Sequence, residues 1–167
     1  MAIKLSEKKS YEKIFLYDNE KIESKNFDYR IRKFKSITNI IFIKGCVKDD
    51  IKSFEGDDNI SLILHLAAIH REPGHFDWEY YETNLKGATN ITKWADKIGC
   101  KDIIFASSIS PYGLSEDIRD ENSLTVPTSA YGGSKLVAEK IHQVWQSNNT
   151  NDKKLIIVRP GVIFGPS

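Results

Sequence analysis

A tyrosine and a lysine four residues apart are the side chains in this sequence best suited to proton transfer. Tyr131 and Lys135 stand in the segment Ser-Ala-Tyr-Gly-Gly-Ser-Lys, and an amphipathic pattern continues it to residue 141. Residues four apart lie on one face of a helix. A phenol has a pKa of about 10, and a nearby ammonium lowers that pKa by favouring the phenolate. The pair therefore predicts a tyrosine that exchanges a proton with an alcohol near neutral pH.

The spacing by itself is also compatible with ordinary packing on a helix surface. The chain holds 7 tyrosines and many lysines, so a chance match is easy. A short motif acquires meaning from the elements around it. The elements that would position Tyr131 and Lys135 therefore decide between the two interpretations.

Short apolar segments alternate with helical patterns along the chain. The predicted strands are residues 13–18, 38–44, 61–68, 102–108 and 154–159, and the predicted helices are 77–98 and 131–146. Residues 2–9 look like the end of a further helix, and residues 20–35 have only weak helical character. Gly87 inside the long helix indicates close packing at that point. Strands that alternate with helices predict an α/β fold with a Rossmann-type, doubly wound parallel sheet.

Several candidate side chains fall where these strands end, which is where doubly wound sheets bind ligands. Asp18 closes the first predicted strand, and an acid in such a place bonds the adenosine ribose and favours NAD over NADP. Small residues at Ala67 and Ala68 leave room for a flat cofactor, and Ser108 offers a hydroxyl to a substrate oxygen. Each position has a plainer interpretation: a surface acid, core packing and a turn serine.

A metal site is a weaker hypothesis. His70, Glu72 and His75 carry suitable ligand atoms, but Pro73-Gly74 breaks any helical pairing and no third histidine is near.

Composition describes a globular chain with a balanced charge. The 167 residues are 40% hydrophobic and 28% charged, with a formal net charge of +1. The charge gives no electrostatic case for nucleic acid or an anionic membrane, and no apolar run reaches membrane-spanning length. Cys46 and Cys100 lie far apart, which fits neither zinc nor a disulfide framework and suggests a cytoplasmic protein.

The ordered set of these residues resembles the extended short-chain dehydrogenase/reductase superfamily, in its branch of NAD-dependent nucleotide-sugar epimerases and dehydratases. The matching positions are Asp18-Asn19, Leu66-Ala67-Ala68, Asn84 with Gly87, Ser107-Ser108 with Tyr112-Gly113, Tyr131 with Lys135, and Arg159-Pro160 with Gly165-Pro166. The resemblance runs from about residue 2 to the end of the chain.

The resemblance implies a role for each position. Tyr131 would transfer the proton, Lys135 would tune it and contact a ribose, Ser108 would hold the substrate oxygen, and Asn84 would steady the site. The implied NAD-binding set is Asp18, Asn19, Val47, Leu66, Ala67, Ala68, Asn84, Tyr131, Lys135, Pro160 and Gly161. A nucleotide sugar would be the substrate, and the helices 77–98 and 131–146 would form a homodimer.

The sequence also departs from the family pattern. Such proteins open with a strand and a glycine-rich turn that holds the pyrophosphate, about 20 residues before the ribose-binding acid, but the first glycine of this chain is Gly45. Residues 1–167 are therefore expected to be a partial dinucleotide-binding domain without its first strand, glycine-rich turn and C-terminal substrate domain. Cys46 stands where an adenine-binding acid is common, and Val162 where a substrate-binding asparagine is common.

Three functional hypotheses are compatible with these residues. The first is part of an NAD-dependent epimerase or dehydratase acting on a nucleotide sugar, inactive as this chain alone. The second is a non-catalytic remnant or binding module, which the missing turn motivates. The third is a reductase of another alcohol or ketone.

Overall fold

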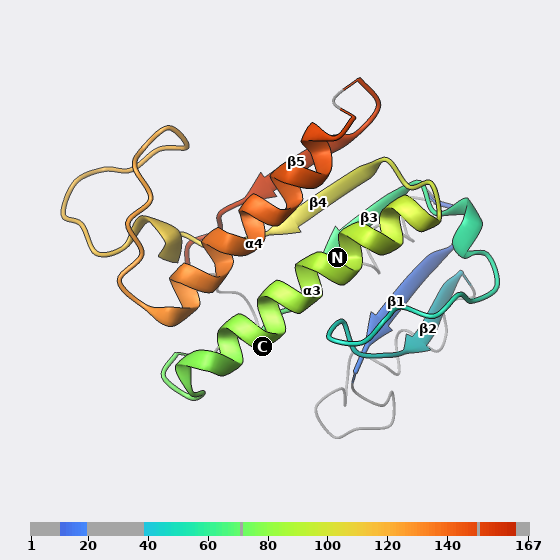
Figure 1. The fold of residues 1–167 in the computed structure, drawn as a ribbon, viewed down its shortest axis with the longest axis horizontal. Coiled ribbons are helices and arrows are strands. Elements are labelled where there is room, and N and C mark those ends of the chain that lie inside the picture. The colour runs from blue at the N-terminus through green and yellow to red at the C-terminus, as the bar shows by residue number, and fades with distance from the viewer. Residues whose placement is uncertain (1–10, 20–38, 71, 150, 163–167) are drawn as a thin grey trace. The chain divides into compact units, whose positions relative to one another are not determined.

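The computed structural model describes residues 11–19, 39–70, 72–149 and 151–162 as strands and helices joined by turns (Figure 1). Packing divides the chain into two units, residues 1–46 and 47–167, and each unit has its own parallel sheet. The predicted helical segments at residues 2–9 and 20–35 lie outside the described residues.

The first unit contains two parallel strands, β1 (Ile14–Asp18) and β2 (Ile40–Lys44). They pair in register from Ile14 opposite Ile40 to Asp18 opposite Lys44. The backbone N–H of Gly45 continues the pairing by donating to the Asp18 carbonyl at 2.9 Å. A Cβ atom at position 45 would overlap the ring of Tyr17, so only glycine fits beside that ring.

The second unit contains three parallel strands in the order β3-β4-β5. They are β3 (Leu62–His65), β4 (Asp102–Ala106) and β5 (Lys154–Val158). Their register places Leu62 opposite Asp102, which in turn lies opposite Lys154. No strand in the described ranges pairs with both β1 and β3, and the order within each sheet agrees with the predicted doubly wound topology.

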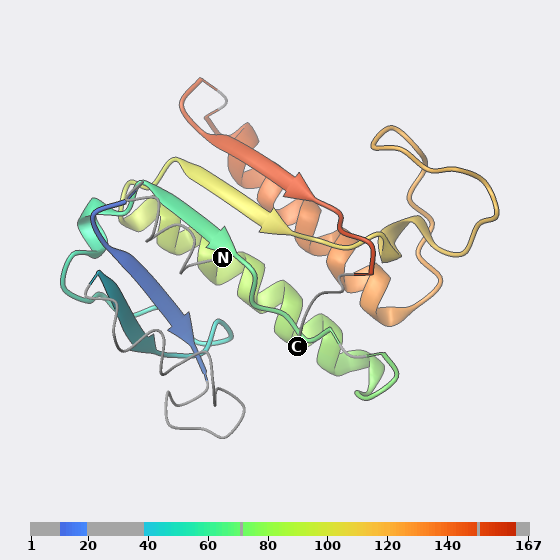
Figure 2. The same cartoon turned by 180° about the vertical axis from the view of Figure 1, so that it is seen from behind.

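Two long helices cover one face of this three-stranded sheet, as Figures 1 and 2 show from opposite sides. They are α3 (Asp77–Lys97) and α4 (Ala130–Ser147). Alternate strand residues point toward them, and the central cluster joins Ala88 of α3, Phe105 of β4 and Ala138 of α4. This packing fixes α4 directly over the end of β4.

Local sequence explains where the helices begin and end. The Glu79 carboxylate accepts a hydrogen bond from the Phe76 backbone N–H at 2.7 Å, which satisfies one free donor at the start of α3. The Ser129 hydroxyl accepts from the Gly132 N–H at 3.2 Å and caps α4. Gly99 follows α3 with a φ of 70°, a left-handed conformation that favours glycine, so it provides the predicted stop.

The other face of the three-stranded sheet carries apolar side chains that stay accessible. Ile156 and Val158 of β5 are 56% and 44% exposed, and Leu64 and Ile104 point to the same side by strand alternation. Figure 2 views the sheet from this side. The sheet in the second unit therefore buries one face well and leaves the other only partly covered.

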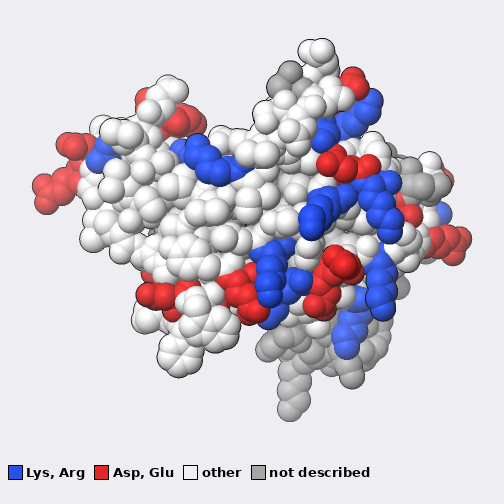
Figure 3. Space-filling model, in the orientation of Figure 1, with Lys and Arg blue, Asp and Glu red and all other residues white. Residues whose placement is uncertain are grey.

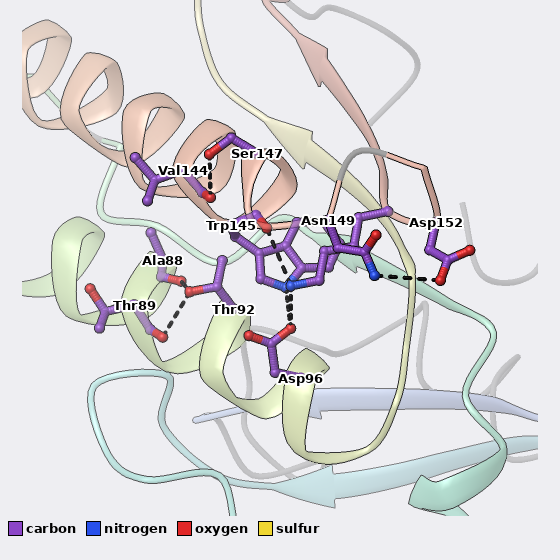
Figure 4. Close-up of polar contacts among 10 residues, drawn as sticks. Ala88, Thr89, Thr92, Asp96, Val144, Trp145, Ser147, Asn149 and Asp152 are labelled. Carbon is purple, nitrogen blue, oxygen red and sulfur yellow. Dashed lines mark hydrogen bonds and ion pairs between the residues drawn. The ribbon is translucent and has the colours of Figure 1, made fainter.

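The carboxyl end of α3 is joined to α4 by polar contacts. The Trp145 indole N–H donates to the Asp96 carboxylate at 2.8 Å, as Figure 4 shows, and Lys153 pairs with the same carboxylate at 2.6 Å. Gly87 packs tightly, as predicted, since a Cβ there would lie 3.1 Å from a Val47 methyl group. Within the described ranges, no helix has the length and apolar character needed to cross a membrane.

The predicted strands are confirmed, although some end earlier than expected. Residues 107–108 follow the end of β4, where the Ser107 N–H still donates to the Val158 carbonyl at 2.8 Å. Residues 66–68 leave the sheet after β3, although their composition is strand-like, and turn into the loop at the carboxyl edge. There, the Ile69 backbone is held by a side chain of α3 rather than by a strand.

Candidate active site

One face of α4 carries three polar side chains at four-residue intervals. Tyr131 is half-buried, whereas Lys135 is 2% exposed and Glu139 is fully buried. The spacing places all three on the side of α4 that packs on the sheet. This face meets the carboxyl end of β4, so the predicted tyrosine–lysine pair lies at the predicted edge of the sheet.

The Lys135 ammonium is directed at the end of β4. Its Nζ donates to the Ala106 carbonyl at 2.7 Å and lies 4.2 Å from the centre of the Phe105 ring. Burial lowers the pKa of Lys135 to about 8, and the nearby Glu139 carboxylate partly opposes that change. The ammonium is thus held in a mostly apolar site by a carbonyl, a ring face and a neighbouring negative charge.

The pKa of Tyr131 moves in the direction opposite to the one predicted. Burial raises the pKa of Tyr131, a side-chain hydrogen bond with Ser108 lowers it, and the charge of Glu72 raises it further. The net direction is upward, so the predicted lowering by Lys135 is not found. The physical reason is that burial of the phenol, with the charge of Glu72, outweighs the hydrogen bond with Ser108, while the Lys135 ammonium donates to the Ala106 carbonyl.

Ser108 combines a turn role with contact to Tyr131. Its Oγ accepts from the Ser110 backbone N–H at 3.1 Å and lies 3.0 Å from the Ser110 hydroxyl. These contacts start the 3-10 turn Ser110–Tyr112. The same hydroxyl hydrogen-bonds Tyr131 and lowers its pKa, so Ser108 is a turn serine that also contacts the tyrosine.

Asn84 of α3 lies at the base of the site and is 3% exposed. Its amide nitrogen donates to the Ser134 hydroxyl at 2.9 Å and to the Ile69 carbonyl at 3.3 Å, while its oxygen accepts from the Ile69 N–H at 3.0 Å. The asparagine therefore joins α3, α4 and the loop after β3.

The other predicted cofactor residues lie at strand ends. Leu66, Ala67 and Ala68 follow β3, and Pro160 and Gly161 follow β5. Val47 begins the second unit, and its carbonyl accepts from Asn90 at 2.9 Å.

Asp18 and Asn19 stand at the end of β1 in the first unit. The Asp18 carbonyl accepts the Gly45 N–H that extends the pairing of β1 and β2.

Sequence reasoning missed a buried ionic network behind Ser108. Arg159 donates to both carboxylate oxygens of Glu139, at 2.9 and 2.6 Å, and to the Tyr112 hydroxyl at 2.7 Å. The Ser107 hydroxyl donates to the same carboxylate at 2.5 Å. The position of Glu139, four residues after Lys135, was the one available indication.

A second missed feature is a pair of buried histidines between β3 and α4. His142 Nδ1 lies 2.7 Å from the Ala138 carbonyl, so that nitrogen carries the proton, and its Nε2 accepts from His65 Nδ1 at 3.1 Å. His142 also stacks on Phe105 with ring centres 4.3 Å apart. Burial lowers the pKa of both histidines, that of His142 to about 4.

The residues of the weaker metal hypothesis are engaged elsewhere. Glu72 accepts from the Ser129 hydroxyl at 3.1 Å, and His75 lies 3.7 Å from the Glu79 carboxylate. In the part of the chain that the structure describes, no three histidine, cysteine or acidic residues are grouped to hold a metal. Glu72 is instead a charge beside Tyr131.

Parallel strands lie under paired helices, and candidate polar residues lie at the carboxyl edge of the strands, which is the arrangement of a Rossmann-type domain. A family model described as the NAD dependent epimerase/dehydratase family matches residues 3–167. The chain belongs to this family, whose members use NAD.

Two curated relatives that the chain matches are epimerases. The chain is 36% identical over 121 residues to an N-acetyl-alpha-D-glucosaminyl-diphospho-ditrans,octacis-undecaprenol 4-epimerase of Escherichia coli O157:H7, covering 72% of this chain and 37% of that protein. It is 31% identical over 124 residues to UDP-glucose 4-epimerase 3 of Oryza sativa, covering 71% and 33%.

A solved UDP-glucuronic acid 4-epimerase from Bacillus cereus, in complex with NAD, has the same fold. It superposes with a TM-score of 0.80 at 22% identity over 98% of this chain and 53% of that one. The chain thus spans about a third of the length of these curated relatives and about half of that solved structure.

Proposed function

We propose that the whole protein is an NAD-dependent epimerase or dehydratase that oxidises a hydroxyl group of a diphosphate-linked sugar. The observation that carries the proposal is the meeting of Tyr131 and Ser108 through a hydrogen bond beside the buried Lys135, at the carboxyl end of β4. Family membership supports the same conclusion. A reductase of another alcohol would use the same three residues, and the matched relatives are epimerases.

The residues present have chemistry that suits the two riboside ends of NAD, but they supply no turn for its pyrophosphate. A nicotinamide riboside requires hydrogen-bonding groups for its ribose and space for its flat ring. The ammonium of Lys135 and the phenol of Tyr131 supply the first, and the small side chains of Ala67 and Ala68 supply the second. Asp18 and Asn19 have the chemistry to hold the adenosine ribose. The sequence has no glycine before Gly45, so residues 1–167 supply no glycine-rich turn for the pyrophosphate.

Further contacts with NAD would come from Val47, Leu66, Asn84, Pro160 and Gly161. Bound NAD supplies the chemistry of hydride acceptance and return.

The residues of the chain would handle the proton and the orientation of the sugar. Tyr131 would take the proton from the sugar hydroxyl as a general base, and Ser108 would orient the same oxygen by a hydrogen bond. The raised pKa of Tyr131 favours its neutral form, and the hydrogen bond with Ser108 is the contact that favours the phenolate needed by a base. Asn84 would keep α3, α4 and the loop after β3 in one arrangement.

The substrate has two candidate carriers. A nucleotide sugar is supported by the UDP-glucose epimerase relatives. A polyprenyl-diphosphate sugar is supported by the relative at 36% identity, whose name specifies an N-acetylglucosaminyl-diphospho-undecaprenol. Both present a sugar diphosphate, and assays of the whole protein with UDP-N-acetylglucosamine and with the lipid-linked sugar separate them.

The test of the reaction is Tyr131→Phe in the whole protein. We expect turnover to fall by at least about 100-fold, the usual contribution of a general base, while NAD affinity stays nearly the same. Ser108→Ala is expected to lower turnover without abolishing it. A Tyr131→Phe variant that kept the wild-type rate would refute the proposed role of the tyrosine.

The alternative of a non-catalytic remnant or binding module is tested on the 167-residue chain itself, which we propose to be a partial dinucleotide-binding domain. Calorimetric titration with NAD is expected to show no binding, because the pyrophosphate turn is missing from the sequence. The DNA sequence upstream of the Met1 codon then distinguishes the two hypotheses. In-frame codons for a strand and a glycine-rich turn would support the enzyme hypothesis, and their absence would support the hypothesis of a non-catalytic remnant.

We further propose that α3 and α4 pair with those of a second copy, in a cytoplasmic homodimer. A groove of about 420 Å³ runs between the two helices and is lined by Thr89, Thr92, Lys93, Asp96, Val137, Lys140, Ile141, Val144, Trp145 and Asn148. Figure 3 shows a charge-poor area on this side of the molecule. Val144 is 61% exposed, and light scattering of Val144→Glu is expected to give a monomer where the wild type gives a dimer. A wild-type monomer at high concentration would contradict the pairing.

A further inference from the structure

The buried carboxylate of Glu139 gathers three segments behind the candidate active site. Arg159 donates Nε and Nη2 to its two oxygens at 2.9 and 2.6 Å, a bidentate arrangement. The Ser107 hydroxyl donates to Oε1 at 2.5 Å. Glu139 is fully buried, and the Arg159 side chain is only 19% exposed. The segments that follow β4 and β5 and the middle of α4 therefore meet at one carboxylate.

Arg159 lies across the backbone from Ser108. The Ser107 N–H donates to the Val158 carbonyl at 2.8 Å, and the Ile109 N–H donates to the Pro160 carbonyl at 3.1 Å. This short ladder extends the pairing of β4 and β5 and holds residues 107–109 beside 158–160. The backbone that carries Ser108 is thus fixed on one side by the ladder and on the other by the Ser107 hydroxyl on Glu139.

Lys135 and Glu139 attach successive turns of α4 to successive residues at the end of β4. Lys135 donates to the Ala106 carbonyl at 2.7 Å, and Glu139 accepts from Ser107, the next residue. Burial lowers the pKa of Lys135, and the negative charge of Glu139 partly opposes that change. One carboxylate therefore acts on both the position of the serine segment and the charge of the lysine.

We propose that Glu139, held by Arg159, is a positioning residue that sets Ser108 against Tyr131 and keeps Lys135 cationic. The proposal rests on the proposed function of those three residues. A buried ion pair is a weak source of net stability, because desolvation of the two charges offsets their attraction. The bidentate pair and its bond to Ser107 are instead arranged around the residues that would act on the substrate.

The charged and polar groups that face Lys135 come from several elements. Glu139 on α4 favours its positive charge, and the Ala106 carbonyl on β4 accepts a hydrogen bond from its ammonium. His65 on β3 and His142 on α4 lie close enough for the charge of Lys135 to lower their own pKa values. Arg159, directly after β5, is bound to Glu139. Glu139 is thus the carboxylate that raises the pKa of Lys135.

The test measures the pKa of Lys135 by the ¹³Cε chemical shift during a pH titration of the 167-residue chain, assigned with Lys135→Met. Glu139→Gln keeps the shape and removes the charge, and we expect the pKa of Lys135 to fall by about one pH unit. Arg159→Lys keeps the positive charge beside Glu139 and is expected to leave the pKa of Lys135 near the wild-type value. Asp96→Asn is the matched control, because it breaks an ion pair with the same 2.6 Å separation elsewhere in the second unit.

The positioning half of the proposal has its own measurement. The pKa of Tyr131, followed by ultraviolet absorbance against Tyr131→Phe, is expected to rise in Ser107→Ala as the bond from Ser108 loosens. This milder substitution serves even if Glu139→Gln fails to fold. An unchanged pKa of Tyr131 in Ser107→Ala would overturn the positioning role. An unchanged pKa of Lys135 in Glu139→Gln, or an equal fall in Asp96→Asn, would overturn the electrostatic role.

Both measurements are made without NAD or substrate. The proposed reaction is tested by the turnover of Tyr131→Phe, whereas the positioning role of Glu139 is tested by these two pKa measurements. Different results would therefore refute the two proposals.

Discussion

Replacing Lys135 with methionine is expected to stabilise the chain at neutral pH, although it removes a residue proposed to be essential. Burial lowers the pKa of Lys135 from 10.5 to about 8. The unfolded chain therefore binds a proton at this position between pH 8 and 10.5 that the folded chain has released, so stability rises with pH in this window. Below pH 8 both states are charged, and the folded state carries the full cost of burying the ammonium.

The magnitude follows from the size of the change in pKa. A difference of 2.5 between the two pKa values corresponds to about 3 kcal/mol at pH 7 and about 1 kcal/mol at pH 10. The lost hydrogen bond to the Ala106 carbonyl offsets about 1 kcal/mol of the gain. We expect Lys135→Met to be about 2 kcal/mol more stable than the wild type at pH 7, and to lose that advantage by pH 10.

The assay is urea unfolding at pH 7 and pH 10, followed by tryptophan fluorescence from the 3 tryptophans of the chain. Lys140→Met is the control, because Lys140 lies on the same helix and is exposed. Its stability relative to the wild type should not change with pH. A constant difference between Lys135→Met and the wild type from pH 7 to pH 10 would refute the account of a buried, destabilising ammonium.

Three further predictions concern the same unit. Gly132→Ala is expected to destabilise the chain by about 1–3 kcal/mol in urea unfolding, because the new Cβ would lie 2.6 Å from the Ser110 carbonyl oxygen; wild-type stability would contradict this. Glu72→Gln is expected to lower the pKa of Tyr131 in an absorbance titration, since the carboxylate raises it, and an unchanged pKa would show that the two groups do not interact. Burial lowers the pKa of His142 to about 4 in the folded state, so the unfolded state binds a proton first as the pH decreases. The free energy of unfolding should therefore fall between pH 6.5 and pH 4, and equal urea midpoints at pH 6.5 and pH 5 would count against this.

Much of the fold could be predicted because the apolar runs and the helical periodicity are strong. The strands that end at Asp18 and Ala106 and the helix that starts near Tyr131 were each placed within a few residues. The strand ends were harder to predict, because Leu66 to Ala68 and Ser107-Ser108 have strand-like composition but lie beyond the ends of β3 and β4. Composition does not encode which backbone groups turn away to meet a side chain such as Asn84.

The sequence predicted where Tyr131 and Lys135 lie on α4, but it did not predict the electrostatics around them. A four-residue spacing correctly predicted that Tyr131 and Lys135 share a face of α4. The direction of the Tyr131 pKa depends on burial and on the charge of Glu72, and neither is visible in the spacing. The Glu139–Arg159 pair joins residues 20 apart across two elements, so no local pattern indicates it.

The accessible apolar face of the three-stranded sheet bears on the fate of this chain in a cell. Ile156 and Val158 expose side chains of a type that chaperones and quality-control proteases recognise in incomplete proteins. We expect the 167-residue chain, produced alone, to be short-lived and present at low abundance. The cellular concentration of the chain would then depend on how quickly this surface is covered. Variants that destabilise the second unit would lower the amount of protein by faster degradation before they changed any catalytic rate.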